Sequence, residues 1–229
     1  MTYLRKGTDR GFNDSGWLQS HHSFSFSSYH DPEHMGFSVL RVINDDQVQA
    51  GAGFPTHSHQ DMEIISYVKQ GAIEHKDSMS NIKMLPAGEF QLMSAGTGVT
   101  HSEYNPSSDN PLSFLQIWIV PDTQGVEPGY QQRHFGRNSG LTLIASPDGR
   151  DGSLSIHQDA CLHHLLLEPG MQLEHAPLTG RDVYVHVVAG HLDVDDQCLE
   201  AGDGIGLSAV GQLQFSAEDE VEALVFDLP

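Results

Sequence analysis

The sequence predicts an all-β protein, and three observations support that prediction. Apolar positions favour a period of two residues over the helical period of about 3.6. The apolar segments are rich in β-branched and aromatic residues, and Gly, Asn, Asp and Pro bound them. With 23 glycines and a hydrophobic fraction of 38%, the composition is typical of a turn-rich β protein rather than of a helical bundle.

Candidate strands can be placed in order along the chain. The turn signals between them include Asn44-Asp45-Asp46 and Pro147-Asp148-Gly149, which contain residues that favour tight turns. No long amphipathic helix is expected. The strands that the pattern predicts most directly are residues 57–59, 64–68, 101–103, 115–120 and 183–188.

An internal repeat divides the chain. An apolar segment ending in Gly at residues 68–71 is followed by another at 85–88, and the same order recurs at 187–190 and 199–202. Such self-similarity predicts two similarly folded β domains. We expect the boundary in the polar stretch 131–140, which gives domains at 1–132 and 133–229.

The charge excludes several classes of partner. The formal net charge is −20, and after Arg181 the chain has eleven Asp and Glu residues but no Lys or Arg. Such a surface repels phosphate backbones and anionic lipid head groups, so direct binding to nucleic acid or to a membrane is not expected.

The location is predicted from what the sequence lacks. There is no run of about 18 apolar residues, and the N-terminal residues lack the apolar core of a secretory signal. The two cysteines, Cys161 and Cys198, form no CxxC pattern. We therefore expect a cytoplasmic protein with free thiols, acting as a monomer.

Two short segments carry metal-ligand side chains at strand spacing: His57-Ser58-His59 and His101-Ser102-Glu103. In a β-strand, residues i and i+2 point to the same face of the sheet. Two neighbouring strands could therefore direct three imidazoles and one carboxylate at one point. The alternative is a set of half-exposed strand residues, because the chain has fifteen histidines.

Such a ligand set would leave coordination positions open. Nitrogen and oxygen donors without sulfur suit Fe, Mn, Co, Ni, Cu or Zn. In the second half of the repeat His175 falls near the place of the first pair, and the position matching His101 falls near Ser216. We therefore expect one divalent metal, in the N-terminal half.

The other histidines are not predicted to bind metal. His75 follows Glu74 in a polar run, which favours a solvated loop or strand edge. His163 and His164 have no ligand-type partner at i+2, so we exclude them as ligands.

The wider pattern resembles a known family. The first segment has a Gly at residue 51 and Glu63 around its two histidines, which is similar to the first cupin motif; Gly98, His101 and Asn105 are similar to the end of the second. The chain as a whole resembles the pirin family of bicupins. The matching stretches are residues 16–18, 22–26, 35–37, 41–46, 57–63, 86–91, 93–98 and 101–105.

The resemblance implies a fold and a ligand set. The fold would be two double-stranded β-helix (jelly-roll) barrels packed face to face. The N-terminal barrel would hold one metal, most simply ferrous iron (Fe2+), through His57, His59, His101 and Glu103. Glu63 would then lie behind the ligands and orient an imidazole N–H, although the alternative for Glu63 is an ordinary surface carboxylate. Asn105 would also lie behind the ligands and support them.

The resemblance also implies an activity, quercetin 2,3-dioxygenation, with a flavonol and dioxygen as substrates. The expected reaction opens the central ring and releases carbon monoxide, and Glu103 is the candidate residue to accept the proton of the flavonol 3-hydroxyl. The alternative from another class is a non-enzymatic regulatory protein that acts through protein partners according to the state of its iron. A purely structural metal is the third possibility.

Overall fold

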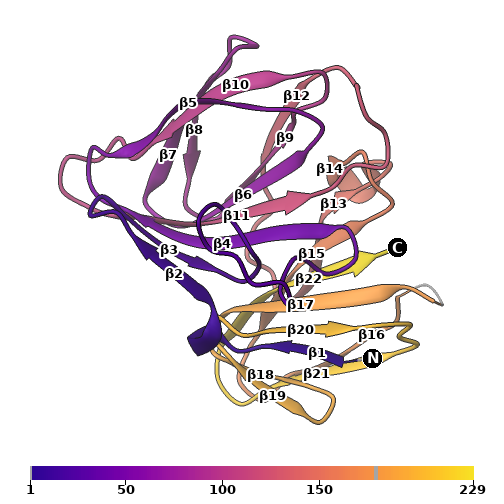
Figure 1. The fold of residues 1–229 in the computed structure, drawn as a ribbon. Helices are drawn as coiled ribbons and strands as arrows, with labels where there is room; N and C mark the ends of the chain where they lie inside the picture. The colour runs from indigo at the N-terminus through magenta and orange to yellow at the C-terminus, as the bar shows by residue number, and fades with distance from the viewer. Residues whose placement is uncertain (1, 178–179) are drawn as a thin grey trace. The chain divides into compact units, whose positions relative to one another are not determined.

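The computed structural model describes residues 2–177 and 180–229, and its regular structure is almost entirely β-strand (Figure 1). Residue 1 of the first expected domain and residues 178–179 of the second lie outside the described residues. The all-β prediction is confirmed. Within the described chain, no helix has the length and apolarity that a membrane span requires.

The chain forms two compact units. The N-terminal unit comprises residues 11–136 and 156–158, and the C-terminal unit comprises residues 2–10, 137–155 and 159–229. Each unit contains one seven-stranded sheet and one four-stranded sheet. This is the two-sheet arrangement of a jelly roll.

The N-terminal unit carries the segments that are expected to bind metal. The order in its four-stranded sheet is β5 (Gly53–His59), β10 (Val99–Tyr104), β7 (Ala72–Asp77) and β8 (Ile82–Pro86). The order in its seven-stranded sheet is β12 (Gly129–His134), β9 (Glu89–Ser94), β6 (Glu63–Gln70), β11 (Leu112–Ile119), β4 (Leu40–Val48), β3 (Leu18–His22) and β2 (Gly11–Asp14).

The C-terminal unit repeats this plan. The order in its four-stranded sheet is β16 (Gln172–His175), β21 (Leu213–Ala217), β18 (His191–Val194) and β19 (Gln197–Glu200). The order in its seven-stranded sheet is β1 (Thr2–Arg5), β20 (Gly204–Leu207), β17 (Asp182–Ala189), β22 (Val221–Leu228), β15 (Cys161–Leu167), β13 (Gly140–Ser146) and β14 (Leu154–Ser155). Two short 3₁₀ turns, Gly7–Asp9 and Arg150–Gly152, complete the regular structure of the described residues.

The internal repeat seen in the sequence corresponds to equivalent hairpins. Gly71 lies between β6 and β7, and Gly190 lies between β17 and β18. Both have a positive φ, 83° and 79° respectively, which an L-residue with a side chain adopts only with strain. The repeated Gly therefore marks the same turn in both units.

Alternating side chains from the two sheets of each unit form its core. In the N-terminal unit Val48, Val68 and Phe114 from the seven-stranded sheet pack with Ile73 and Leu85 from the four-stranded sheet. All five are at most 1% exposed. Burial of each such side chain contributes about 1.5–3 kcal/mol to folding.

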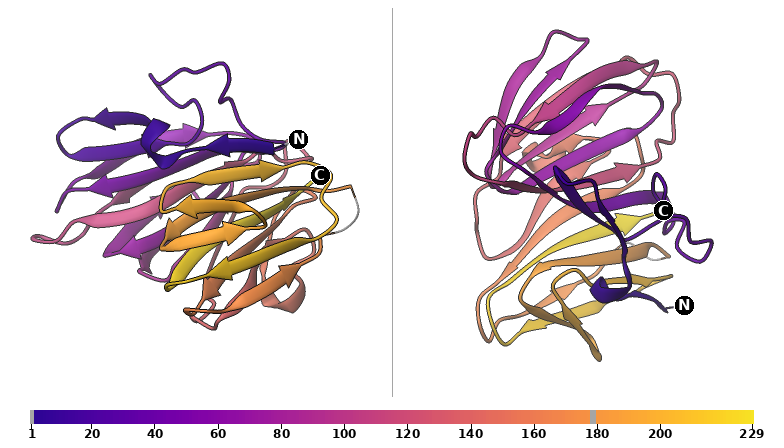
Figure 2. Two further views of the ribbon diagram at one scale, coloured as in Figure 1. Left: turned by 90° about the horizontal axis from the view of Figure 1, so that it is seen from below. Right: turned by 60° about the vertical axis from the view of Figure 1, so that its left-hand side comes forward.

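The division of the chain differs from the expected boundary at 132/133. That position falls inside β12, which pairs with β9 and belongs to the N-terminal unit. Residues 2–10 belong instead to the C-terminal unit, because β1 pairs antiparallel with β20, as the indigo strand beside yellow strands shows in Figure 2. β1 and β20 lie near opposite ends of the sequence, so the local pattern gives no sign of this exchange.

Candidate metal centre

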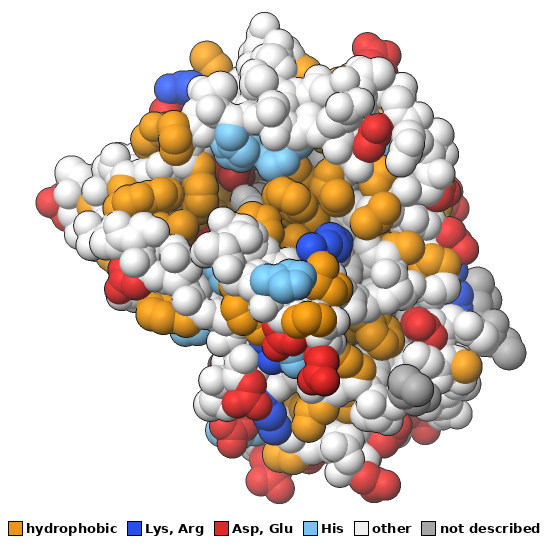
Figure 3. Space-filling model, in the orientation of Figure 1, with side chains coloured by type: hydrophobic (Ala, Val, Ile, Leu, Met, Phe, Trp, Pro, Cys, Tyr) orange, Lys and Arg blue, Asp and Glu red, His pale blue; other side chains and the backbone are white. Residues whose placement is uncertain are grey.

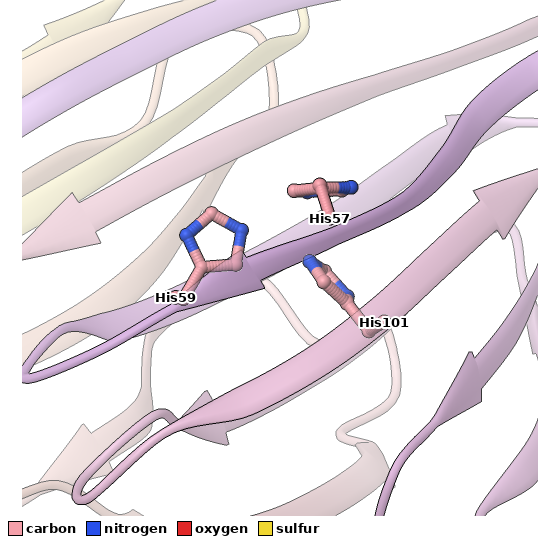
Figure 4. Close-up of side chains that lie close together, drawn as sticks. All are labelled: His57, His59 and His101. Carbon is pink, nitrogen blue, oxygen red and sulfur yellow. The ribbon is translucent and has the colours of Figure 1, made fainter.

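Strands β5 and β10 bring three histidines together. The two strands pair antiparallel with His57 directly opposite His101, and His59 lies two residues further along β5, on the same face. The ring centroids of His57 and His101 are 4.5 Å apart, those of His57 and His59 4.8 Å, and those of His59 and His101 5.0 Å. Figure 4 shows the three rings pointing toward one another above the two strands.

The nitrogens of these rings are arranged as metal ligands require. The Nδ1 of His57 lies 2.8 Å from the carbonyl oxygen of Pro55, which it meets as an N–H donor, leaving Nε2 free to coordinate. In the part of the chain that the structure describes, His59 Nε2 and both ring nitrogens of His101 are buried without a hydrogen-bond partner. Buried polar atoms without partners are costly, so their convergence indicates a missing ligand.

Burial also keeps the rings of His59 and His101 neutral. It lowers the pKa of His59 to about 4, with a further contribution from the nearby His57. It lowers the pKa of His101 to about 2, with smaller contributions from His57, His59 and His75. A neutral imidazole has a lone pair to offer a metal, whereas an imidazolium has none.

Glu103 lies two residues beyond His101 on β10 and is 2% exposed. Ser66 Oγ donates to its Oε1 at 3.3 Å, and Gln116 Nε2 donates to its Oε2 at 3.3 Å. Burial raises the pKa of this carboxyl to about 7, and the two hydrogen bonds oppose the rise. A carboxyl with such a pKa can hold or release a proton near neutral pH.

The potential ligands form two overlapping groups rather than one. His57, His59 and His101 have ligand atoms within 4.8 Å of one another, as do His75, His101 and Glu103. His101 is common to both groups. The structure therefore brings the four predicted ligands to one region and adds His75 to them.

The sequence-based prediction for His75 was wrong. It lies on β7, which is an inner strand of the four-stranded sheet, and is 0% exposed rather than solvated. Its neighbour on β10 is Glu103, and its Nε2 lies 3.0 Å from Oδ2 of Asp77. The strand alternation Ile73, His75, Asp77 is the signal that could have identified it.

The two predicted supporting residues lie in other environments. Glu63 is 1% exposed, so it is no surface carboxylate; it accepts hydrogen bonds from Ser94 Oγ at 2.9 Å and His157 Nδ1 at 3.2 Å. Asn105 donates from Nδ2 to three backbone carbonyls, including that of Val48 at 3.2 Å, and so fixes the loop after β10. Among the described residues, neither Glu63 nor Asn105 hydrogen-bonds to the converging rings, and the imidazole that Glu63 contacts is that of His157.

The family models match both halves of the chain. A model described as Pirin matches residues 5–119, and a model described as the quercetinase C-terminal cupin domain matches residues 143–228. The chain belongs to the pirin family.

Known relatives of this pirin match along its whole length. An Escherichia coli K12 protein named quercetin 2,3-dioxygenase is 49% identical over 229 residues, covering 100% of this chain and 99% of the relative. The crystal structure of YhhW from E. coli superposes with a TM-score of 0.98 at 49% identity, covering 100% of this chain and 98% of that one. A second structure, bacterial pirin YhhW in complex with nickel(II), has a TM-score of 0.97 at 48% identity, with coverages of 100% and 99%.

The centre of this pirin is open on one side. His57 and His59 are only half-buried. His59, but not His57 or His101, also lines a surface cavity of 510 Å³. The Trp118 ring stands edge-on to His59, with centroids 5.1 Å apart. In Figure 3, histidine side chains of the N-terminal unit border a hollow with hydrophobic side chains around it.

The donors that are present suit a divalent transition metal. Imidazole nitrogens and a carboxylate without sulfur are ligands for the metals from manganese to zinc, and the unpartnered nitrogens of His59 and His101 are the atoms that a metal would satisfy. Because His57 and His59 are only half-buried, a ligand can reach a metal held by their rings. The residues therefore fit the metal that the family implies.

Proposed function

We propose that this pirin is a metal-dependent oxidoreductase of the quercetin 2,3-dioxygenase type. It would add both atoms of dioxygen to a flavonol, open the central ring and release carbon monoxide. One observation carries the proposal: three imidazoles converge beside a buried carboxyl, His59 and His101 have buried nitrogens without a hydrogen-bond partner, and His57 and His59 are only half-buried. The curated name of the 49% identical relative supports the enzyme over a purely regulatory protein.

The ligand set proposed for the metal is His57, His59, His101 and Glu103. Their placement on paired strands β5 and β10 supports this assignment, as does the hydrogen bond that leaves His57 Nε2 free. His75 stands behind the set and would hold Glu103 and His101 in place through packing. Ferrous iron is the metal we propose, and the nickel complex of YhhW supports a site that takes divalent metals of the first transition row.

Glu103 has the proton-transfer role in this proposal. A divalent metal held by the histidines would supply Lewis acidity toward a phenolic oxygen. Glu103, whose pKa burial raises to about 7, would accept the proton of the flavonol 3-hydroxyl on a carboxylate oxygen. Ser66 and Gln116 would keep the carboxylate oriented, because each donates a hydrogen bond to one of its oxygens.

The proposal also covers the substrates, the oligomeric state and the location of the protein. The substrate would be a planar flavonol together with dioxygen, and the protein would act as a monomer without nucleic acid or membrane. Cys161 and Cys198 are both free thiols, which supports the predicted cytoplasmic location.

Reconstitution under anaerobic conditions tests the proposal. Metal-free protein is loaded separately with Fe2+, Ni2+, Mn2+, Co2+, Cu2+ and Zn2+, and quercetin loss, oxygen uptake and carbon monoxide release are then measured together. We expect metal-dependent turnover with the three quantities in equal proportion.

Two variants complete the experiment. His57→Ala should lose both metal and turnover, whereas His191→Ala, at an exposed histidine of the C-terminal unit that pairs with Asp219, should keep both. Absence of turnover with every metal, or a His57→Ala protein as active as the wild type, would refute the enzyme proposal.

A further inference from the structure

A second cavity of the N-terminal unit lies between its two sheets. It has a volume of 280 Å³ and is lined by residues of β2, β3, β4 and β11 from the seven-stranded sheet and by Phe54 of β5 from the four-stranded sheet. Phe26 adds a second aromatic wall, and His22 and Asn44 add polar groups. This cavity is distinct from the open one at His59, because the two share no lining residue.

Asp46 is the residue that the established roles leave unexplained. It lies on β4, lines the cavity and is only 2% exposed. Among the described residues, its Oδ1 has no hydrogen-bond partner. Burial is the main cause that raises its pKa to about 7, and a hydrogen bond from Ser20 opposes the rise. A buried carboxyl oxygen without a partner is costly, and here it belongs to a side chain that lines a cavity where a ligand or water could meet the carboxyl.

The network around Asp46 holds it in position. Ser20 Oγ lies 3.3 Å from His22 Nδ1, which in turn lies 2.8 Å from Asn44 Oδ1. These side chains come from adjacent, paired strands β3 and β4, with Ser20 opposite Asp46 and His22 opposite Asn44. The polar wall of the cavity is therefore built before any ligand enters.

The cavity shares a wall with the candidate metal centre. Gln116 lines the cavity and donates to Glu103 Oε2 at 3.3 Å. Phe54, on the opposite sheet, is the register partner of Glu103 on β10. One end of a molecule bound in the cavity would therefore lie next to the carboxyl of Glu103.

The size of the cavity limits what it can hold. A dry cavity of about 150 Å³ accommodates benzene, so 280 Å³ has room for one substituted aromatic ring. Phe26 and Phe54 offer apolar surfaces to such a ring, and a phenolic hydroxyl can both donate to and accept from a carboxyl.

We infer that this cavity binds one hydroxylated aromatic ring of the substrate and that Asp46 selects for the ring's hydroxyl by hydrogen bonding through its carboxyl group. Asp46 is then a specificity-determining residue that contacts the substrate, separate from the metal ligands. The assignment of the ring to a substrate rests on the proposed function, whereas the cavity's preference for a phenol does not.

Direct binding of a matched pair of probes tests the inference. Calorimetric titration of the full-length, metal-loaded protein under anaerobic conditions compares p-cresol with toluene, which differ only by the hydroxyl. We expect the wild type to bind p-cresol about tenfold more tightly. Asp46→Leu should abolish this preference, and Asp46→Asn, which keeps a hydrogen-bonding group of the same shape, should retain most of it.

The neighbouring aspartate provides the control. Asp45 precedes Asp46 on β4 and forms an ion pair with Lys69, so its side chain does not line the cavity. Asp45→Leu should leave the preference for p-cresol unchanged, and metal content measured on every variant separates loss of selectivity from loss of the centre. Equal affinity of the wild type for the two probes, or a preference that survives Asp46→Leu, would overturn the inference.

Kinetics separate this inference from the proposed function. Quercetin and 3-hydroxyflavone share the reacting ring but differ in their other hydroxyl groups. In Asp46→Leu we expect the KM for quercetin to rise toward that for 3-hydroxyflavone. Selective p-cresol binding without any flavonol turnover would support the cavity inference and refute the dioxygenase proposal. Flavonol turnover with no effect of Asp46→Leu on KM would support the dioxygenase proposal and refute the cavity inference.

Discussion

The two units have the same strand order but fill the equivalent positions with different chemistry. In the N-terminal unit His57 of β5 pairs with His101 of β10. At the equivalent place in the C-terminal unit, His175 of β16 pairs with Leu213 of β21. Two residues further on, Phe215 pairs with Val194 of β18, as Glu103 pairs with His75. Leu213, Phe215 and Val194 belong to the apolar core of the C-terminal unit. One scaffold thus supports either a polar centre or a continuous core, and only the side chains decide which.

This comparison refines the sequence-based alignment of the repeat. The position equivalent to His101 is Leu213, rather than one near Ser216, because the register with His175 fixes it. Of the five residues that gather in the N-terminal unit, the C-terminal unit keeps one histidine. His175 there lies beside His163, with ring centroids 5.5 Å apart. No third ligand-type residue joins this pair among the groups that the described residues form.

The largest expected effect comes from making the N-terminal unit like its counterpart at the central ligand. His101→Leu should lower the metal content from one equivalent to near zero, because His101 is common to both ligand groups. Turnover should fall at least about a hundredfold. Elemental analysis and the quercetin assay check this, with His175→Leu as the control that keeps both. A His101→Leu protein with full metal content would contradict the equivalence.

The next effect concerns the core of the C-terminal unit. Phe215 is 0% exposed, so Phe215→Ala should lower the free energy of unfolding by about 3–5 kcal/mol through loss of buried area and the cavity that remains. Chemical denaturation measures this change. The metal content of the folded variant should stay at the wild-type value, since this core holds no ligand. A loss of metal at unchanged stability would reverse the roles we assign to the two units.

A smaller effect is expected behind Glu103. In the repeat, Gly71 of the N-terminal unit aligns with Gly190 of the C-terminal unit. The same alignment makes Val185 the counterpart of Ser66. Ser66→Ala removes the hydrogen bond to Glu103 Oε1 and makes the position apolar like its counterpart, without adding volume at this fully buried site. Metal affinity should fall about tenfold, as for other residues that orient ligands. Competition with a chelator measures it, and an affinity equal to that of the wild type would show that Gln116 alone suffices.

The smallest effect concerns the attachment of the N-terminal strand. Burial of Asp203 would by itself raise its pKa, but hydrogen bonds from Lys6 and from the backbone of Gly7 and Glu200 outweigh it and hold the pKa below its usual range. A lowered pKa means that the ionised carboxylate stabilises the fold above the unfolded pKa of about 3.9, and this stability is lost as pH falls through the lower folded value.

Asp203→Asn should therefore destabilise the protein by about 1–2 kcal/mol at pH 7. The difference from the wild type should shrink once the pH falls below about 4. Thermal unfolding of both proteins between pH 3 and pH 8 gives the comparison. A difference that stays constant over this range would show that ionisation of Asp203 is not its source.

The sequence predicted the elements that depend on local pattern. Alternation and β-branched residues located β5, β6, β10, β11 and β17, and the two i, i+2 pairs located the three converging histidines. These predictions succeed because the period of a strand is set by its own backbone. The equivalence of the two hairpins succeeded for the same reason, since the turn requires Gly locally at both Gly71 and Gly190.

The features that the sequence did not reveal depend on contacts between distant strands. His75 reads as polar and solvated until β10 pairs with its strand and covers it. Glu63 lies against His157, which is 94 residues away in the chain. Asp46 reads as part of a turn signal, although it is a buried member of β4. A single sequence carries no record of which strands become neighbours, so these three residues required coordinates.

The pairing of β1 with β20 limits how this chain can be cut. The polypeptide passes between the two units at residues 10/11, 136/137, 155/156 and 158/159, so no single cleavage point releases either one intact. A gene fragment starting after residue 136 would leave β20 with a bare hydrogen-bonding edge, the kind of edge that invites aggregation. Fragments cut at a single domain boundary are therefore expected to misfold, unless the fragment that carries the second half also includes the first ten residues.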